Sequence, residues 1–195
     1  GYRVYDEKLV RVDGREYRRW DPFRSKIAAA ILRGLREFPV SRNTNVLYLG
    51  ASSGTTASHI SDVTDGCVYC VEFSKRMMRD LMVVCEVRRN MIPILGDARH
   101  PWEYSALIGS VDVLIQDVAQ PNQADILLGN TGFFDIPRAL LAIKARSISS
   151  VRNPRKVYNQ EISKLKKVFH VKEIVELAPF VKDHILVSLE RKQVE

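Results

Sequence analysis

Short runs of apolar residues alternate with amphipathic stretches along most of the chain. Five runs are almost continuously apolar, as expected for strands buried on both faces: 46–50, 67–72, 91–95, 111–116 and 140–144. Four intervening stretches carry apolar residues at helical spacing, at about 56–63, 74–89, 123–129 and 154–169. This alternation of strands and helices predicts a parallel sheet that is covered by helices on both faces.

The C-terminal part of this pattern changes character. Residues 170–177 and 184–189 predict two further strands, which are joined by a short loop that contains Pro179. Such a pair forms an antiparallel addition to a parallel sheet. The fold that we predict is therefore α/β and Rossmann-like, with a mostly parallel seven-stranded sheet.

The first twenty residues alternate differently, around Asp13-Gly14, which is a strong hairpin signal. We expect 1–20 to form a small arginine-rich β appendage with strands at 2–5, 9–12 and 16–18, and 21–195 to form the α/β domain. Asp21-Pro22 predicts the start of a helix that Pro39 ends. Its expected apolar stripe comprises Ile27, Ala28, Ile31, Leu32 and Leu35.

Composition narrows the class of protein. A chain of 195 residues that is 46% hydrophobic can bury one substantial core, and its net charge of +7 suits a polyanionic partner. Three cysteines make no disulfide framework, which indicates a reducing compartment. No run of about 18 apolar residues and no signal peptide is visible, so we expect no membrane association and a cytoplasmic location. Because the chain opens with Gly1 rather than Met, a few native residues are expected to be missing from the appendage.

The segment 45–59, NVLYLGASSGTTASH, has the layout of a nucleoside-binding loop. An apolar strand stops at Gly50, a loop of small residues follows, and a helix then begins. The start of such a helix offers unpaired backbone N–H groups to a ligand. Glu72 follows about 20 residues later, where an acidic residue of a doubly wound fold accepts from a ribose diol.

The loop narrows the choice of ligand without deciding it. A dinucleotide site requires a second glycine where this chain has Ser52, and no Gly-Lys-Ser/Thr closes a P-loop. S-adenosylmethionine has no phosphate and tolerates the loop. An ordinary strand–loop–helix connection without a ligand explains the loop alone equally well.

The ends of the other strands favour the ligand. Glu72 can accept from both ribose hydroxyls and Phe73 can pack on the adenine face. Asp97 can accept from the adenine amino group, and Ala98 can donate a backbone N–H to a ring nitrogen. A single acid at a strand end is often a helix N-cap. Acids at three strand ends, the third being Asp117, favour a ligand-binding edge.

These residues lie in segments that resemble the fibrillarin family, and the archaeal form is the more similar because no glycine-arginine-rich tract is present. The segments are WDPFRSKIAAAI (20–31), VLYLGASSGTTASHISD (46–62), VEFSKRMMRDL (71–81), IPILGDARHPWEY (92–104), QDVAQPNQADILL (116–128), AIKARSI (142–148) and KDHILV (182–187). The resemblance implies a class I S-adenosylmethionine-dependent fold that methylates the ribose 2′-hydroxyl of RNA at positions chosen by a guide RNA.

The resemblance also implies site residues. The cofactor-binding residues would be Gly50, Ala51, Thr55, Thr56, Glu72, Phe73, Asp97, Ala98, Asp117, Val118, Ala119 and Gln120. The catalytic residues would be Lys26, Asp117, Lys144 and His184. We assign the base to Lys144, because a partly desolvated lysine among other cations has a lowered pKa. Asp117 would orient it, Lys26 would hold the phosphate or the developing alkoxide, and His184 would complete the hydrogen-bond network.

The implied partners are box C/D guide RNA, substrate rRNA or tRNA, a Nop-domain coiled-coil scaffold protein and a kink-turn-binding ribosomal-type protein. Two alternatives stay open: a non-catalytic RNA-binding scaffold with the same fold, and a small-molecule O-methyltransferase. The basic stretch 144–167 is either a solvated helix face or a nucleic-acid patch. Cys67, Cys70 and Cys85 are expected to be core residues, His59 is expected to lie on a helix surface or to pack rather than to bind a ligand, and no metal is predicted.

Overall fold

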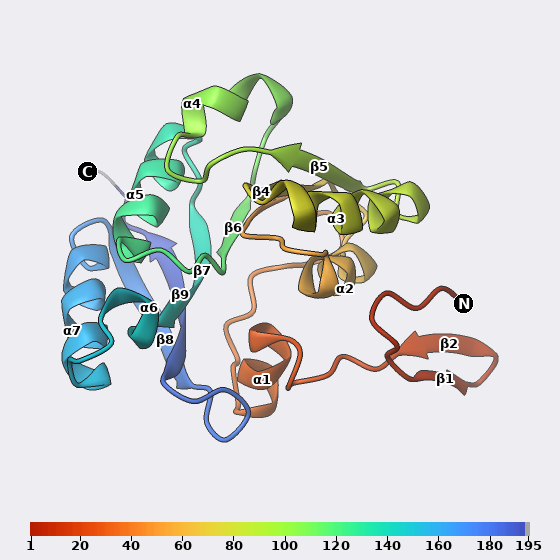
Figure 1. The fold of residues 1–195 in the computed structure, drawn as a ribbon, viewed down its shortest axis with the longest axis horizontal. Helices are drawn as coiled ribbons and strands as arrows, with labels where there is room; N and C mark the ends of the chain where they lie inside the picture. The colour runs from red at the N-terminus through yellow and green to blue at the C-terminus, as the bar shows by residue number, and fades with distance from the viewer. Residues whose placement is uncertain (194–195) are drawn as a thin grey trace.

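The computed structural model describes residues 1–193, and most of them surround one seven-stranded sheet (Figure 1). The strand order is β5-β4-β3-β6-β7-β9-β8. The strands are β3 (Val46–Leu49), β4 (Val68–Glu72), β5 (Met91–Leu95), β6 (Val113–Gln116), β7 (Arg138–Lys144), β8 (Phe169–Glu176) and β9 (His184–Arg191). Strands β3 to β7 are parallel, and β9 is antiparallel to both β7 and β8. The predicted mixed sheet is confirmed.

Helices cover both faces of the sheet (Figure 1). They are α1 (Lys26–Leu32), α2 (Thr55–Val63), α3 (Lys75–Val87), α4 (Pro101–Tyr104), the 3₁₀ helix η1 (Ser105–Leu107), α5 (Gln123–Phe133), α6 (Ala145–Ile148) and α7 (Pro154–Leu165). Successive side chains of a strand face opposite sides, so β3 contributes to two cores. Val46 and Tyr48 pack with α1, α2 and α3, whereas Leu47 and Leu49 pack with α4, α5 and α7.

The strand order reverses at β3, which has β4 on one side and β6 on the other. The chain therefore leaves the carboxyl ends of β3 and β6 toward opposite faces of the sheet. In open α/β sheets a ligand crevice forms outside the carboxyl ends at such a reversal. The fold itself thus selects the edge where the site should lie.

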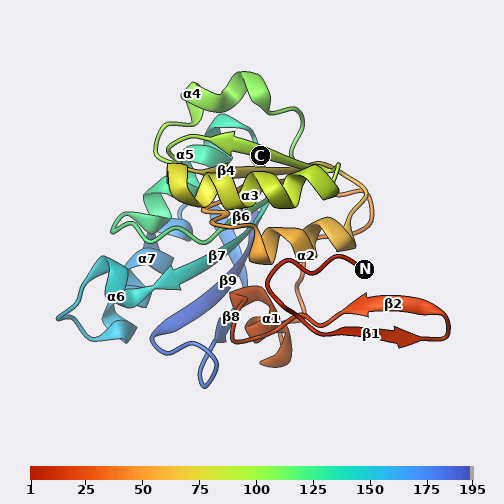
Figure 2. The same ribbon diagram turned by 45° about the vertical axis from the view of Figure 1, so that its right-hand side comes forward.

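A separate two-stranded hairpin, β1 (Leu9–Val12) and β2 (Arg15–Arg18), extends from the molecule (Figure 2). Asp13 and Gly14 both have positive φ, as the predicted tight turn requires. The strand expected at 2–5 is wrong, because the structure has no strand there. The carboxylate of Glu7 accepts the backbone N–H groups of Val4 and Tyr5 at 3.0 and 2.9 Å, so it takes donors that a strand would use.

Ionic and aromatic contacts anchor the hairpin to α2. Arg18 is paired with the buried Glu7 and, at 2.6 Å, with Asp62. The Tyr5 hydroxyl lies 2.7 Å from Nε2 of His59, and Trp20 stacks on the His59 ring at 5.0 Å between centroids. Burial, aided by the charge of Arg18, lowers the pKa of His59 to about 4. His59 is therefore a packed, neutral residue, which decides between the two positions, helix surface or packing, that the sequence left open.

The first helix differs from its prediction at both ends. It begins at Lys26, where the Ser25 hydroxyl caps Ala28, whereas Asp21 only accepts the N–H of Phe23 in a preceding turn. It ends at Leu32 because Gly34 adopts φ +99, well before Pro39. Only part of the expected stripe is buried: Ile27, Ala28 and Leu35 are buried, and Ile31 and Leu32 are exposed.

Three short helices, α4, η1 and α6, were not predicted, because three or four residues carry no measurable periodicity. The cysteines are free and behave as expected: Cys70 is buried with one core, Cys67 packs against the other, and Cys85 is partly buried. Within the described residues, no helix has the length and apolar character needed to cross a membrane.

Candidate active site

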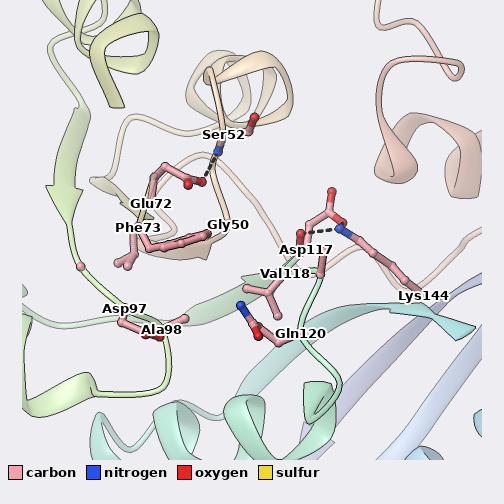
Figure 3. A pocket seen from close by; sticks show the side chains of 13 residues that line it. Gly50, Ser52, Glu72, Phe73, Asp97, Ala98, Asp117, Val118, Gln120 and Lys144 are labelled. Carbon is pink, nitrogen blue, oxygen red and sulfur yellow. Dashed lines mark hydrogen bonds and ion pairs between the residues drawn. The ribbon is translucent and has the colours of Figure 1, made fainter. Parts of the chain in front are cut away.

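A cavity of about 300 Å³ lies at the carboxyl ends of β3, β4, β5 and β6 (Figure 3). Nine of the twelve expected cofactor-binding residues line it: Gly50, Glu72, Phe73, Asp97, Ala98, Asp117, Val118, Ala119 and Gln120. Ser52, Val71, Gly96 and Lys144 complete the lining. Ala51, Thr55 and Thr56 do not line the cavity. Ala51 and Thr56 are buried beneath the loop, where the Thr56 hydroxyl donates to Ser25.

Two glycines shape the loop after β3. Gly50 has φ +80, and a Cβ there would lie 3.0 Å from the backbone oxygen of Asp117. Gly54 has φ +87 at the start of α2, where a Cβ would lie 3.0 Å from Leu81. Both positions therefore need glycine for conformation and for space. The close approach at Gly50 brings the β3 and β6 strand ends together at the cavity.

Glu72 joins the β3 loop to the β4 end. Its side chain is buried, and Oε2 accepts the Ser52 N–H at 2.9 Å (Figure 3). Oε1 accepts the Ser74 N–H at 2.8 Å. A carboxylate offers about four acceptor sites. Two of them stay available toward the cavity after these bonds. Phe73 is 68% exposed at the rim, so its ring is open to a flat ligand.

The β5 end contributes Asp97 and Ala98. Hydrogen bonds from the Arg99 side chain, helped by the Arg99 backbone N–H, lower the pKa of Asp97 against the opposing effect of burial. The Ala98 carbonyl accepts from Asn130 at 2.7 Å. The backbone N–H of Ala98 has no hydrogen-bond partner among residues 1–193, and Ala98 is part of the cavity lining. An available N–H beside a carboxylate suits the edge of an adenine ring.

At the far end of the cavity three charged side chains form one cluster. Asp117, just after β6, lies between Lys26 of α1 and Lys144, the last residue of β7. The Nζ of Lys26 is 3.0 Å from Oδ2 of Asp117, and the Nζ of Lys144 is 2.8 Å from Oδ1. Lys144 also donates to the Asp117 carbonyl at 2.7 Å. Two lysine side chains therefore share one carboxylate at this end of the cavity.

The fourth expected catalytic residue lies beside this cluster, because His184 of β9 pairs with Lys144 in the sheet register. Its Nδ1 lies 2.7 Å from the Lys182 carbonyl. A carbonyl only accepts, so Nδ1 carries a proton and Nε2 of the neutral ring keeps a lone pair. Burial lowers the pKa of His184; the Lys182 carbonyl opposes this shift, and Lys26 and Lys144 add to it. All four residues are thus brought together.

Sequence reasoning missed Gln123, a fully buried residue in the first turn of α5. Its Oε1 accepts the Lys144 N–H at 2.9 Å and its Nε2 donates to the Lys144 carbonyl at 3.4 Å. Gln116 donates in turn to the Gln123 carbonyl at 2.7 Å. A lone glutamine carries no sequence signal, so only the structure reveals this support of Lys144. No group of three potential metal ligands occurs within residues 1–193.

The strand order, the antiparallel β9 beside β7 and the cavity at the carboxyl edge define a class I S-adenosylmethionine-dependent methyltransferase fold. More narrowly, this chain belongs to the fibrillarin family, whose model matches residues 1–193.

Three relatives illustrate this membership. The fibrillarin-like rRNA/tRNA 2′-O-methyltransferase of Methanothermobacter thermautotrophicus is 51% identical over 98% of this chain and 87% of its own length. Aeropyrum pernix fibrillarin, solved with natively bound S-adenosyl-L-methionine, matches with a TM-score of 0.89 and 49% identity, over 97% of this chain and 84% of that chain. The structure of a fibrillarin/Nop5p complex matches with a TM-score of 0.90 and 40% identity, over 97% and 90% of the two chains.

Proposed function

We propose that this chain is an S-adenosylmethionine-dependent RNA 2′-O-methyltransferase, which acts on rRNA and tRNA as the catalytic subunit of a box C/D guide-RNA particle. Family membership supports the activity. The observation that carries the proposal is the Lys26–Asp117–Lys144 cluster, which meets the cavity at one end. A pure scaffold has no need for two ammonium groups on one carboxylate at this position.

The cavity fits S-adenosylmethionine. Glu72 retains acceptor sites for a ribose diol, the Ala98 N–H can bind a ring nitrogen beside Asp97, and Phe73 can cover the adenine. A Cβ at Gly50 would press on the backbone of Asp117, which also lines the cavity. When bound, the cofactor supplies an electrophilic methyl group. Asp117 would supply a carboxylate for the positive charge of its sulfonium.

This chain's residues would then position the acceptor hydroxyl and remove its proton. Lys26 and Lys144, the two basic side chains of the cluster, would stabilise the oxygen as negative charge develops on it. The sequence assigned the base to Lys144, and Nε2 of His184 offers a second proton acceptor beside the same cluster. We assign proton acceptance to Nε2 of His184, whose neutral ring has a lone pair at ordinary pH.

The partners of this chain are inferred from the complexes that its relatives form. A fibrillarin was solved in complex with Nop5p, so we infer that a Nop-domain scaffold protein binds this chain too. The kink-turn-binding protein and guide RNA complete the particle. The net charge of +7 favours RNA over a small neutral substrate, which argues against a small-molecule O-methyltransferase.

Guide dependence tests the function. The purified chain with cofactor and substrate RNA should methylate inefficiently and without site preference, because it binds RNA through phosphates alone. Addition of scaffold protein, kink-turn protein and guide RNA should direct methylation to one ribose, and a guide shifted by one nucleotide should shift the modified position equally. Efficient methylation of one chosen ribose by the chain alone would contradict the guided-subunit proposal. A complete particle without activity would favour the scaffold alternative.

A further inference from the structure

A second cavity, of about 440 Å³, is lined by His184, which does not line the cofactor cavity. It is lined by the first turn of α7 (Asn153, Pro154, Arg155 and Tyr158) and by the segment between β8 and β9. Because His184 is the register partner of Lys144, the two cavities flank the same catalytic pair. The first cavity is assigned to the cofactor, so the second is a candidate site for the methyl acceptor beside the same pair.

The charges of the second cavity suit a polyanion. Arg155 and Lys182 are exposed, and neither forms an ion pair within the described part of the chain. Asp183 is already neutralised by Arg146 at 3.0 Å, which leaves Glu176 as the opposing charge. The two available cations therefore outnumber the available carboxylate.

The start of α7 shows the same preference. Its first turn carries Arg155 and Lys156 and no acidic residue. The N-terminus of a helix has a partial positive charge, so cations there destabilise the helix and anions stabilise it. This arrangement is unfavourable for the isolated chain and becomes favourable when an anion binds beside it. The helix end and the free cations point to the same kind of ligand.

Tyr158 contributes an aromatic ring and a hydroxyl group to the lining of the second cavity. Its hydroxyl has no hydrogen-bond partner among residues 1–193. Burial raises the pKa of Tyr158 to about 12, with Asp183 and Glu176 adding to the shift, so the hydroxyl remains a donor at neutral pH. A phenol ring with a free O–H beside two cations matches the sugar and phosphate of a nucleotide.

We propose that this cavity is an RNA-strand subsite, in which Arg155 and Lys182 bind the phosphate, and Tyr158 contacts the nucleotide, adjacent to the ribose that is methylated. The inference rests on the proposed function, because it takes substrate RNA to be the acceptor. By holding the neighbouring nucleotide, the subsite would fix the target 2′-hydroxyl against Lys144 and His184.

The test is the double variant R155Q/K182Q, with R42Q/R89Q as a control that removes the same charge. Arg42 and Arg89 are exposed and precede β3 and β5, at the opposite edge of the sheet. For the chain alone with single-stranded RNA, we expect the slope of log K against log salt concentration to be about one unit shallower in R155Q/K182Q, because one to two phosphate contacts are lost. The control should keep the wild-type slope.

Two further readouts separate the outcomes. In the complete particle, R155Q/K182Q should lower kcat/KM for substrate RNA by about tenfold or more, while the Kd for S-adenosylmethionine is unchanged. A salt slope and kcat/KM equal to those of the control would overturn the subsite, as would loss of scaffold binding with unchanged RNA binding. If the wild-type particle fails to methylate, the proposed function fails, and the salt slope still decides whether the cavity binds RNA.

Discussion

Glu72 has two tasks at one carboxylate: it holds two backbone N–H groups and it faces the cavity. The sequence predicted the cavity-facing role from its position at a strand end, and the structure adds the bonds to Ser52 and Ser74. These bonds fix the orientation of the carboxylate before a ligand arrives. A fixed acceptor loses less entropy on binding than a mobile one.

Replacement of Glu72 with alanine should therefore weaken S-adenosylmethionine binding by about 1–3 kcal/mol, the cost of unpaired polar groups in a buried site. Isothermal titration calorimetry measures this directly. Glu86→Ala, which removes the same charge from an exposed position of α3, should leave the affinity unchanged. If Glu72→Ala and Glu86→Ala bind equally well, Glu72 does not contact the cofactor.

Other single residues show where sequence reasoning stops. Asp97 and Asp117 were predicted because acids at consecutive strand ends form a pattern along the chain. Gln123 and Ser52 were not, because their contributions depend on contacts with Lys144 and Glu72 across the fold. A polar side chain that supports a backbone group elsewhere has no local signature.

At the scale of elements, the strands were predicted best. Those buried on both faces are apolar throughout, so β3, β4 and β5 agree with their predictions closely, and β6 and β7 differ only at their first residues. The ends of α1 were predicted poorly. Ser25 and Asp21 are both good caps, and tertiary packing selected Ser25. The segment 2–5 alternates like a strand, yet Glu7 binds its backbone instead.

The contact between hairpin and α2 predicts a pH dependence of stability. The pKa of His59 falls from 6.5 to about 4 in the folded protein, so between these values the unfolded chain binds more protons. The free energy of unfolding should therefore decrease by about 1–3 kcal/mol as the pH is lowered from 7 to 4. The backbone N–H groups of Tyr5 and Val4, with Arg18, outweigh burial and lower the pKa of Glu7 to about 2, which extends the loss below pH 4.5.

Urea unfolding of His59→Gln at several pH values isolates this effect. The variant should be less stable than the wild type at pH 7, because it loses the contacts of His59, and should show a flatter dependence between pH 6.5 and 4. His170→Gln, which alters an exposed histidine of β8 outside the hairpin contact, is the matched control. Equal profiles for wild type and His59→Gln would show that the hairpin contact does not titrate.

At the scale of the whole molecule, the parallel sheet brings distant segments to one edge. Lys26 and Asp117 are 91 residues apart in sequence, and they meet because α1 packs beside the carboxyl ends of the strands. The order of the sheet could be expected from the alternation of strands and helices, whereas the ion pairs could not. They depend on side-chain reach across elements. The family resemblance suggested the four catalytic residues, of which Asp117 also follows from the pattern of acids at strand ends.

The central claim is that this cluster performs methyl transfer at the edge of the cofactor cavity. Single-turnover methylation by the complete particle, with saturating cofactor and RNA, tests it most directly in Lys144→Ala. We predict a rate at least about 10²-fold below wild type, because an oriented cation at the reacting oxygen is lost, with cofactor affinity nearly unchanged. Lys8→Ala, an exposed lysine before β1, serves as the control. A Lys144→Ala particle that methylates at the wild-type rate would contradict the account.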